Sequence, residues 1–421
     1  MSGVLRRALD HSYSSVVRDH VTLLTVARLT ANSAYRFAPP FIATIARDTG
    51  VSIVTVGVAL TVSELGGLLS PFLGRLIDGW HRRGTMSIGL TGVSLSSFAV
   101  AASPGTLTFA LALLGIGISK TVFDIALAGW IADHVAYDRR ARVVGLTELS
   151  WAGGLLIGVP IMGIVAAATS WRGGYVVAAI GVMVLAGVVA KRLADTAAPP
   201  VEPPEQPVAA RSEDGSEDGS PVRPDRSRRR LLTVVASFGC LMGAAQCAFV
   251  TFGSWLEDSF DATATGLAAV SFGLGVGELV ASSSTVRVTD RWGKRRSVAI
   301  GAALMIPAGV LMTTAAHEHL VTGLAVLGVY IVGFEFAVVS GLSLASNLVP
   351  GRPGTGVGFM FGAGTLGRAL TNVAATKLYE LHGIVGPFVL GSALAAACVA
   401  LVVSSGSAPQ PVAPGARSAG T

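Results

Sequence analysis

GRLIDGWHRR at residues 74–83 and DRWGKRR at residues 290–296 are two copies of one pattern, Asp-x-Trp-x-basic-Arg. Each copy follows one long apolar run and precedes another, and the second copy lies about half the chain length after the first. A basic turn that recurs between hydrophobic segments at this spacing is typical of a membrane protein built from two related halves. The repeat therefore predicts the topology of the chain and a substrate site between the two halves.

The composition also favours a membrane protein, because 51% of the residues are apolar and only 13% are charged. Soluble domains carry about 25% charged residues. A helix that spans a membrane needs about 20 mainly apolar residues, and the long runs do not alternate as barrel strands do. The expected spans are twelve, at residues 21–46, 51–73, 85–103, 105–132, 143–167, 172–190, 231–255, 263–286, 297–315, 320–346, 355–378 and 384–403.

These spans predict an all-α integral membrane protein in which twelve transmembrane helices form two six-helix halves. The expected N-terminal half is 1–192 and the C-terminal half is 231–405. Between them, 193–230 is rich in Pro and repeats Glu-Asp-Gly-Ser, so it cannot bury a core and is expected to be a disordered cytoplasmic linker. Residues 406–421 are expected to be a disordered tail.

The basic residues predict the orientation, because cytoplasmic loops of membrane proteins carry an excess of Lys and Arg. With the N-terminus inside, 24 of the 31 Lys and Arg residues fall on the cytoplasmic side. Both termini are therefore expected in the cytoplasm, in a multi-pass protein of the cell (cytoplasmic) membrane. The net charge of +6 reflects this bias, so we expect no nucleic-acid partner.

Twelve spans, the division into two sixes and the repeated turn together resemble the major facilitator superfamily (MFS) over essentially the whole chain. The signature of that family between helices 2 and 3 is Gly-x-x-x-Asp-basic-x-Gly-Arg-basic. Gly79 and His81 depart from it in the first copy, and Val286 replaces the leading Gly in the second. The matching residues are Gly74, Asp78, Arg82 and Arg83 in the first copy and Asp290, Arg291, Gly293, Lys294 and Arg295 in the second.

The resemblance implies that the two turns act as a conformational latch. An Asp at the end of one helix can face the N-terminal amides of a neighbouring helix, and basic residues beside it hold the loop at the membrane surface. The alternative is a pair of ordinary positive-inside loops.

A second signature lies in the fifth expected helix and resembles Gly-x8-Gly-x3-Gly-Pro-x2-Gly-Gly of the antiporter, or drug and sugar efflux, branch. Val159 displaces the Pro by one position, and the last Gly pair is single. Small residues four apart allow helices to approach closely, and Pro bends a helix. Generic packing is the alternative, because the chain has 52 Gly. The matching residues are Gly145, Gly154, Gly158, Pro160 and Gly163.

Ionisable residues inside the expected helices are candidate functional residues, since a charge in the bilayer is costly. The carboxyl groups that could couple transport to protons are Glu278, Glu335, Glu64, Asp124 and Glu148. The candidates for a substrate cavity are Arg28, Asn32, Arg36, Lys120, Gln246 and Arg368. Expected helices 3, 6, 9 and 12 carry none of these charges, and in the resembled fold these four helices are peripheral.

Similar depth in the membrane suggests which charges pair. Arg36 is expected to pair with Glu64, and Glu335 with Arg368, while Lys120 and Asp124 are four residues apart on one helix. By this count Glu278 is the spare carboxyl group, and an unpaired buried carboxyl group binds a proton readily. Glu278 is therefore the first candidate for proton coupling. The alternative is that all these residues form structural ion pairs.

The function that these observations favour is proton-coupled efflux of a small organic compound by alternating access. An importer of an organic anion or sugar is the first alternative, because the buried basic residues could receive a carboxylate. A non-transporting membrane receptor on the same fold is an alternative of another class. ATP-driven transport is not expected, since no phosphate-binding Gly-x-x-x-x-Gly-Lys-Ser/Thr loop is present.

We expect no enzyme activity, no cofactor and no metal. His317 and His319 lack matching ligands, and the cysteines Cys240, Cys247 and Cys398 fall in apolar helices as packing residues. The expected partners are a small-molecule substrate, protons and the lipid bilayer, with the protein a monomer. The identity of the substrate is not legible, because aromatic residues make up only 7% of the chain and indicate no pocket lined by rings.

Overall fold

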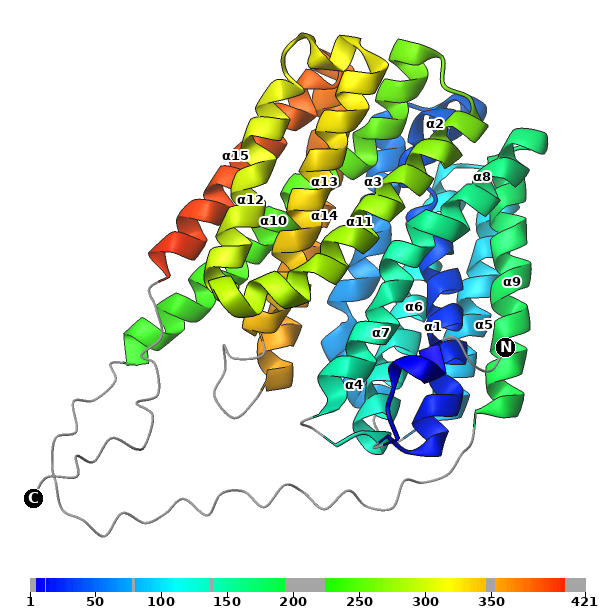
Figure 1. Ribbon diagram of the computed structural model, residues 1–421. Helices are drawn as coiled ribbons and strands as arrows, with labels where there is room; N and C mark the ends of the chain where they lie inside the picture. Colours follow the sequence, from blue (N-terminus) through cyan, green and yellow to red (C-terminus); the bar gives the residue numbers. More distant parts are fainter. Residues whose placement is uncertain are drawn as a thin grey trace, which may run out of the picture.

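The computed structural model describes residues 5–11, 13–77, 80–136, 139–193, 224–345 and 353–405. Its regular elements over these ranges are helices, and Figure 1 shows the long ones running side by side. In the first part of the chain they are η1 (Leu5–Ala8), α1 (Ser15–Arg36), η2 (Pro39–Phe41), α2 (Ile42–Thr49), α3 (Ile53–Leu68), α4 (Ser70–Ile77), α5 (Arg82–Ala101), α6 (Thr106–His134), α7 (Arg140–Gly153), the π-helical segment η4 (Gly154–Gly158), α8 (Val159–Ala168) and α9 (Trp171–Arg192).

The second part of the chain supplies a further group of helices, coloured green to red in Figure 1. They are α10 (Pro224–Phe260), α11 (Ala264–Trp292), α12 (Lys294–Leu311), η5 (Ala315–Glu318), α13 (Leu320–Ala345), α14 (Pro353–His382) and α15 (Val385–Ser404). Because α10 begins at Pro224, its first turns fall inside the segment expected to be a linker. Most of that segment, and the whole expected tail 406–421, lie outside the described residues.

Local sequence explains where several of these helices begin and end. Ser14 and Ser52 accept hydrogen bonds from backbone amides in the first turns of α1 and α3, and such side chains satisfy amides that lack helical partners. The first expected span breaks after α1 because Pro39 and Pro40 cannot continue its hydrogen bonding. Pro71 likewise accompanies the break between α3 and α4.

Eight described helical spans are long and apolar enough to cross a membrane. The described helices thus confirm an all-helical, multi-pass membrane protein, while the total of twelve stays a prediction. The other expected spans correspond to α1, which carries several charges, to the shorter α3 with α4, and to α12 and α14. The eight are Arg82–Ala101, Thr106–His134, Arg142–Ala168, Trp171–Arg192, Arg229–Phe260, Ala264–Thr285, Leu320–Gly341 and Val385–Ser404.

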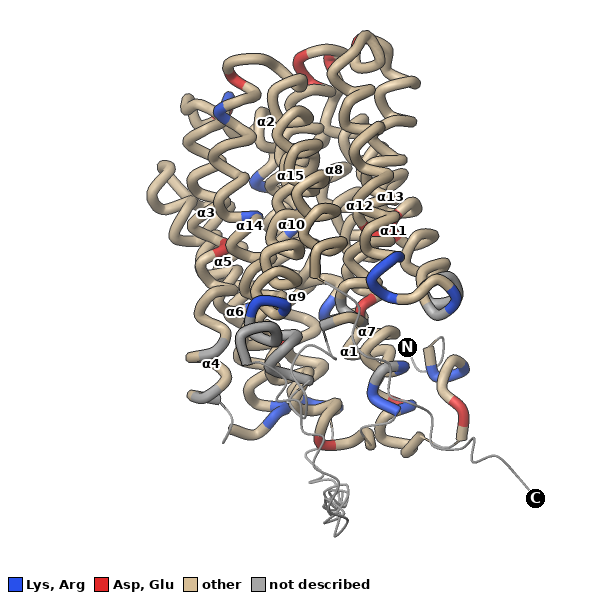
Figure 2. The backbone as a smooth tube through the Cα atoms, turned by 90° about the vertical axis from the view of Figure 1, so that its left-hand side faces the viewer, with Lys and Arg blue, Asp and Glu red and all other residues tan. Residues whose placement is uncertain are grey.

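Charged residues gather toward the two ends of the helices, and Figure 2 shows a middle zone that is mostly uncharged. Exposed apolar side chains away from the helix ends include Leu95 of α5, Val184 of α9 and Leu370 of α14, each more than half exposed. An exposed apolar surface of this kind is expected where lipid replaces water around the protein.

The two groups of helices meet along a seam in which α3 packs along α14, α11 packs on η4 and α8, and α10 packs on η2 and α2. Glycine makes these approaches possible. A Cβ atom on Gly57 would lie 2.5 Å from the Oγ1 of Thr376, and one on Gly275 would lie 2.5 Å from the backbone nitrogen of Leu156. The absence of a side chain at these positions lets helices from different groups touch, as small residues do in membrane proteins generally.

Candidate functional site

Two buried arginine–carboxylate pairs cross the seam. Arg36 at the end of α1 donates two hydrogen bonds to Glu278 on α11, at 2.9 Å from Nη1 and 2.6 Å from Nη2. Arg368 on α14 donates to Glu64 on α3, at 2.9 Å from Nη2 and 3.1 Å from Nε. Bidentate pairs of this kind fix orientation as well as distance. Each pair therefore ties a helix of the first group to a helix of the second.

These pairs correct two predictions, because the expected partner of Arg36 was Glu64 and that of Arg368 was Glu335. Position along a helix gives the depth of a residue but not the side of the helix on which it lies with respect to a neighbour. Four charges at similar depth could therefore pair in more than one way, and the packing of α3 against α14 decides the pairing.

Glu335 on α13, rather than Glu278, is the carboxyl group left over. Its Oε1 accepts a hydrogen bond from Ser282 at 2.5 Å, and its Oε2 is buried without a hydrogen-bond partner. Among the described residues no basic group forms an ion pair with it, and the residue is only 5% exposed. The charge count assigned the unpaired carboxyl group to Glu278, which the structure instead pairs with Arg36.

Glu335 lies near Glu278, because its hydrogen-bond partner Ser282 belongs to the same helix as Glu278. Ser282 is one turn beyond Glu278 on α11, so one face of that helix presents both groups. A negative charge on Glu335 would add to that of Glu278, and burial strengthens this repulsion. The protonation of Glu335 and the strength of the Arg36–Glu278 pair are therefore linked.

A second polar cluster lies within the first group of helices. Arg28 on α1 donates to Asp124 at 2.9 Å and forms an ion pair with Glu148 at 2.8 Å. Lys120 forms the expected pair with Asp124 at 2.5 Å. Two basic and two acidic residues balance here, which agrees with the structural alternative for these four candidates.

The amide candidates are buried at helix contacts. Asn32 on α1 donates to the hydroxyl of Ser150 on α7 at 3.2 Å. Gln246 on α10 donates to the Oδ1 of Asn372 on α14 at 2.7 Å. The Nδ2 of Asn372 has no hydrogen-bond partner, although the residue is fully buried.

The cavity between the two arginine pairs measures about 60 Å³. A water molecule occupies about 30 Å³ in the liquid, so a larger substrate requires the lining helices to move apart. The cavity is lined by Tyr35, Arg36, Pro39, Pro40, Leu60, Ser63, Glu64, Trp151, Leu155, Met242, Ala245, Gln246, Phe249, Phe334, Arg368 and Asn372.

The sequence analysis did not identify the aromatic side chains or Asn372 as residues of the cavity, although their spacing from charged residues offered a signal. Trp151 lies one turn after Glu148, and Asn372 one turn after Arg368, so each shares a helix face with a charged candidate. Tyr35 directly precedes Arg36. The low overall share of aromatic residues concealed that four of them gather at this cavity.

Three of the four signature glycines in the fifth expected helix lie at close helix contacts. Positions 154 and 158 face α1, where a Cβ atom on Gly154 would lie 3.2 Å from the Cβ of Asn32 and one on Gly158 would collide with the side chain of Ser33. Gly163 faces Ala268 of α11, and Pro160 lies in the first turn of α8. Space around Gly145 is open. These contacts explain why residues 154, 158 and 163 are glycines. The interpretation of the pattern as a signature of efflux transporters stays a prediction.

The two latch turns are described only in part. Asp78 and the side chain of Asp290 lie outside the described residues. Arg82 donates to Asp133 of α6 at 3.0 Å, and Arg295 donates to the carbonyl oxygen of Val402 near the C-terminal end of α15 at 2.7 Å. The positive φ of Gly293, 83°, suits a residue without a side chain in the turn between α11 and α12.

Arg82 and Arg295 thus contact helices of their own group. Gly74 lies in α4 in open space, and Arg291 is exposed in the last turn of α11. Arg83 is the second residue of α5 and Lys294 is the first residue of α12, and each makes a polar or ring contact. The proposed role of the turns in conformational change remains a prediction.

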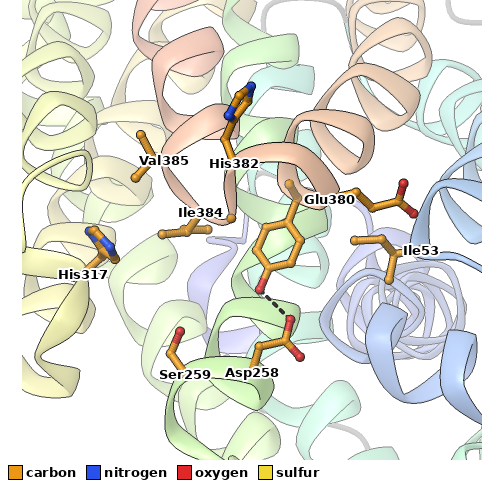
Figure 3. A pocket seen from close by; sticks show the side chains of 10 residues that line it. Ile53, Asp258, Ser259, His317, Glu380, His382, Ile384 and Val385 are labelled. Atoms are coloured by element: carbon orange, nitrogen blue, oxygen red, sulfur yellow. Dashed lines mark hydrogen bonds between the residues drawn. The ribbon is translucent and has the colours of Figure 1, made fainter.

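At the end of the bundle that carries α2 and η5, further contacts cross the seam. Glu257 on α10 accepts hydrogen bonds from Thr44, at 2.7 Å, and from Arg47 of α2. Beside them lies a surface pocket of about 500 Å³, shown in Figure 3. There Tyr379 donates to Asp258 at 2.8 Å. This pocket is larger than the central cavity, but it lies apart from the two buried arginine pairs.

Comparison with known proteins shows the family to which the chain belongs. Residues 24–257 match the family described as Major Facilitator Superfamily. The chain is 28% identical over 165 residues to uncharacterized transporters named YgaY in Escherichia coli K12 and in Escherichia coli O157:H7. That match covers 38% of this chain and 41% of each relative, so the chain spans about two fifths of their length.

A solved structure shares the fold over nearly the whole chain. It is the crystal structure of a bacterial homolog of the human lysosomal transporter Spinster, in an inward-facing and unoccupied conformation. The TM-score is 0.68, with 93% of each chain covered and 11% sequence identity. At this identity the likeness concerns the fold alone.

Proposed function

Because the chain belongs to the Major Facilitator Superfamily, we propose that it is a secondary transporter that couples protons to the efflux of a small organic compound. The substrate crosses the cytoplasmic membrane by alternating access between two six-helix halves. The excess of basic residues on one side supports cytoplasmic termini and a cytoplasmic linker at 193–230. The twelve apolar runs support twelve spans in all.

The observation that carries the coupling is the unpaired carboxyl group of Glu335. A carboxylate buried without a cation is costly, so we assign to Glu335 the binding and release of the coupled proton. When the proton leaves, negative charge appears beside Glu278 and competes for Arg36. The Arg36–Glu278 pair joins the two groups of helices, so the loss of the proton changes a contact on which their separation depends.

The second crossing pair, Arg368–Glu64, completes the mechanism. Both pairs must separate or exchange partners when the groups of helices move apart at this depth. Each separation exposes charges that water or substrate must then solvate, which makes the intermediate arrangement unfavourable. We assign Arg28, Lys120, Asp124 and Glu148 to the rigid frame of the first group, because they bond to one another within it.

The latch and the glycine contacts support the same movement. We propose that Asp78 and Asp290 hold the turns after the second and eighth spans in one conformation, with the basic residues beside them at the cytoplasmic surface. The contacts of Gly154, Gly158 and Gly163 let the fifth span touch both α1 and α11, where the groups meet.

Import of an organic anion is the second candidate, and the basic side chains at the cavity favour it. Arg36 and Arg368 both line the cavity, and Lys120 lies 5.6 Å from the ring of Tyr35. An anion would have to displace Glu64 or Glu278 from an arginine. We therefore favour efflux of a compound that does not compete for these residues.

The test is a substrate screen in proteoliposomes with an imposed pH gradient. The proposal predicts that at least one small organic compound moves against its concentration gradient while protons move the opposite way. Movement of compound and protons in the same direction would favour import, and transport that ignores the pH gradient would contradict proton coupling. Empty liposomes under the same gradient are the control.

A further inference from the structure

The central cavity brings together four aromatic side chains from four helices. Tyr35 comes from α1, Trp151 from α7, Phe249 from α10 and Phe334 from α13. The rings of Phe249 and Phe334 meet edge to face with centroids 5.9 Å apart. Planar rings prefer such neighbours at 4.5–7 Å, so an aromatic or flat apolar group would find partners of the same kind here.

The charges at the cavity are already satisfied by protein groups. Both Nη atoms of Arg36 bond to Glu278, and its guanidinium lies 4.5 Å from the ring centroid of Trp151 and 5.4 Å from that of Phe249. Arg368 bonds through Nε and Nη2 to Glu64. A charged ligand would leave its own charge without a counter-charge unless it broke one of these pairs. An uncharged ligand does not compete with Glu278 or Glu64 for either arginine.

One polar feature of the cavity is incomplete, and it is the pair of amides formed by Gln246 and Asn372. One hydrogen bond joins them, from Nε2 of Gln246 to Oδ1 of Asn372. The Nδ2 of Asn372 is left as a buried donor without a partner. No described residue donates to the Oε1 of Gln246, which is left as an acceptor.

This pattern does not depend on which way the two amides are turned. If both amides were flipped, the bond would run from Asn372 to Gln246, and again one donor and one acceptor would remain. The bonded pair of amides thus has one donor and one acceptor left, which is the complement of an amide group, whose carbonyl accepts and whose N–H donates. An unpaired buried donor is unfavourable, so a ligand that satisfies it gains affinity.

We propose that the substrate of this cavity is an uncharged molecule with an aromatic body and an amide-like group, in which a carbonyl and an N–H lie side by side. The amide bonds to Asn372 and Gln246, and the ring packs among Trp151, Phe249 and Phe334. This inference rests on the proposed function for the use of the cavity in transport. The binding itself requires neither a membrane nor a proton gradient.

The experiment compares four probes that share one ring system and differ in one group: naphthylacetamide, methyl naphthylacetate, naphthylacetate and naphthylethylamine. Their binding to the purified full-length protein in detergent is measured by titration calorimetry. The amide is expected to bind most tightly. The ester should bind less tightly because it offers an acceptor and no donor. The acid and the amine should bind most weakly, since each brings an unpaired charge.

Variants of Asn372 and Gln246 test whether the probes bind at these two amides. Asn372→Leu should weaken binding of the amide probe by about three- to tenfold, the effect of one lost hydrogen bond, and Gln246→Met should act in the same direction. The control is Thr376→Val, one turn further along α14. Thr376 is buried and donates to the backbone of Asn372, but it does not line the cavity, so probe affinity should not change.

Tighter binding of the acid or the amine than of the amide would overturn the proposal, as would equal affinity of wild type and Asn372→Leu for the amide. Binding of none of the four probes would overturn it as well. None of these results touches proton coupling, because no pH gradient is present. A failure of the pH-gradient screen with intact probe binding would instead contradict the proposed transport function.

Discussion

Single charged residues control how the two groups of helices hold together, and Arg36 is the most sensitive of them. It is 7% exposed, and its partner Glu278 is fully buried. Removing one member of a buried ion pair leaves the other charge without compensation and costs about 3–5 kcal/mol. Removing both members avoids that cost. Double variants can therefore show which carboxylate pairs with Arg36.

Glu278→Gln should reduce the amount of folded protein and its unfolding temperature, because Arg36 then keeps a buried charge. The double variant Arg36→Gln/Glu278→Gln should recover most of both. Size-exclusion profiles in detergent and thermal unfolding measure these effects. The matched control is Arg36→Gln/Glu64→Gln, which leaves Glu278 and Arg368 unpaired and should not recover. Recovery in that control instead would mean that the pairing described for Arg36 is wrong.

At the scale of helices, the seam depends on glycine where α3 meets α14. A Cβ atom on Gly57 would lie 2.5 Å from the Oγ1 of Thr376, closer than such atoms approach. Gly57→Ala should therefore destabilise the protein by about 1–3 kcal/mol, as overpacking does. Gly57→Ala/Thr376→Ala should restore part of the loss. Gly187→Ala on α9, where space is open, is the control. Thermal unfolding that is unchanged in Gly57→Ala would refute this contact.

A second contact between elements responds to pH. Asp48 of α2 accepts hydrogen bonds from the indole of Trp171, at 2.8 Å, and from Arg172 at the start of α9. The bond from Trp171, together with Arg172, holds the pKa of the Asp48 carboxyl below its ordinary value. A group whose pKa is lower in the folded state stabilises the fold above its unfolded pKa, about 3.9. That stabilisation is lost as the pH falls through the folded pKa.

The unfolding temperature of wild type should therefore exceed that of Asp48→Asn at neutral pH, and the difference should shrink toward zero as the pH falls below about 4. The difference should be small, because the Asp48 side chain is 44% exposed to solvent. Thermal unfolding of both proteins across this pH range measures it. A difference that grows on acidification would contradict the assigned direction.

Elements were predicted from sequence more reliably than contacts between them. Apolar length and the two basic turns predicted the helices and the family, because a lipid environment allows few alternatives to a helix. The expected spans 21–46 and 51–73 are each broken into separate helices near Pro39, Pro40 and Pro71. These prolines were visible in the sequence, but the spans were expected to be continuous. The pairing of Arg36 and of Glu335 could not be predicted, since it depends on how helices far apart in sequence rotate against one another.

For the whole molecule, the distribution of basic residues predicts the orientation in the membrane. With 24 of 31 Lys and Arg on one side, a reporter fused after residue 210 should report the cytoplasm and one fused after residue 318 should report the outside. Paired reporters that are active only inside or only outside make the measurement. If residue 210 were accessible from outside, the predicted orientation would be wrong.

The central claim for the whole molecule is that Glu335 carries the coupled proton, and the most direct test measures proton flux and substrate flux together. Wild type, Glu335→Gln and the surface control Glu380→Gln are reconstituted in liposomes with a compound found in the pH-gradient screen. Glu335→Gln should lose accumulation driven by the pH gradient and keep exchange of substrate down its own gradient, while Glu380→Gln behaves as wild type. Undiminished proton coupling in Glu335→Gln would contradict the account.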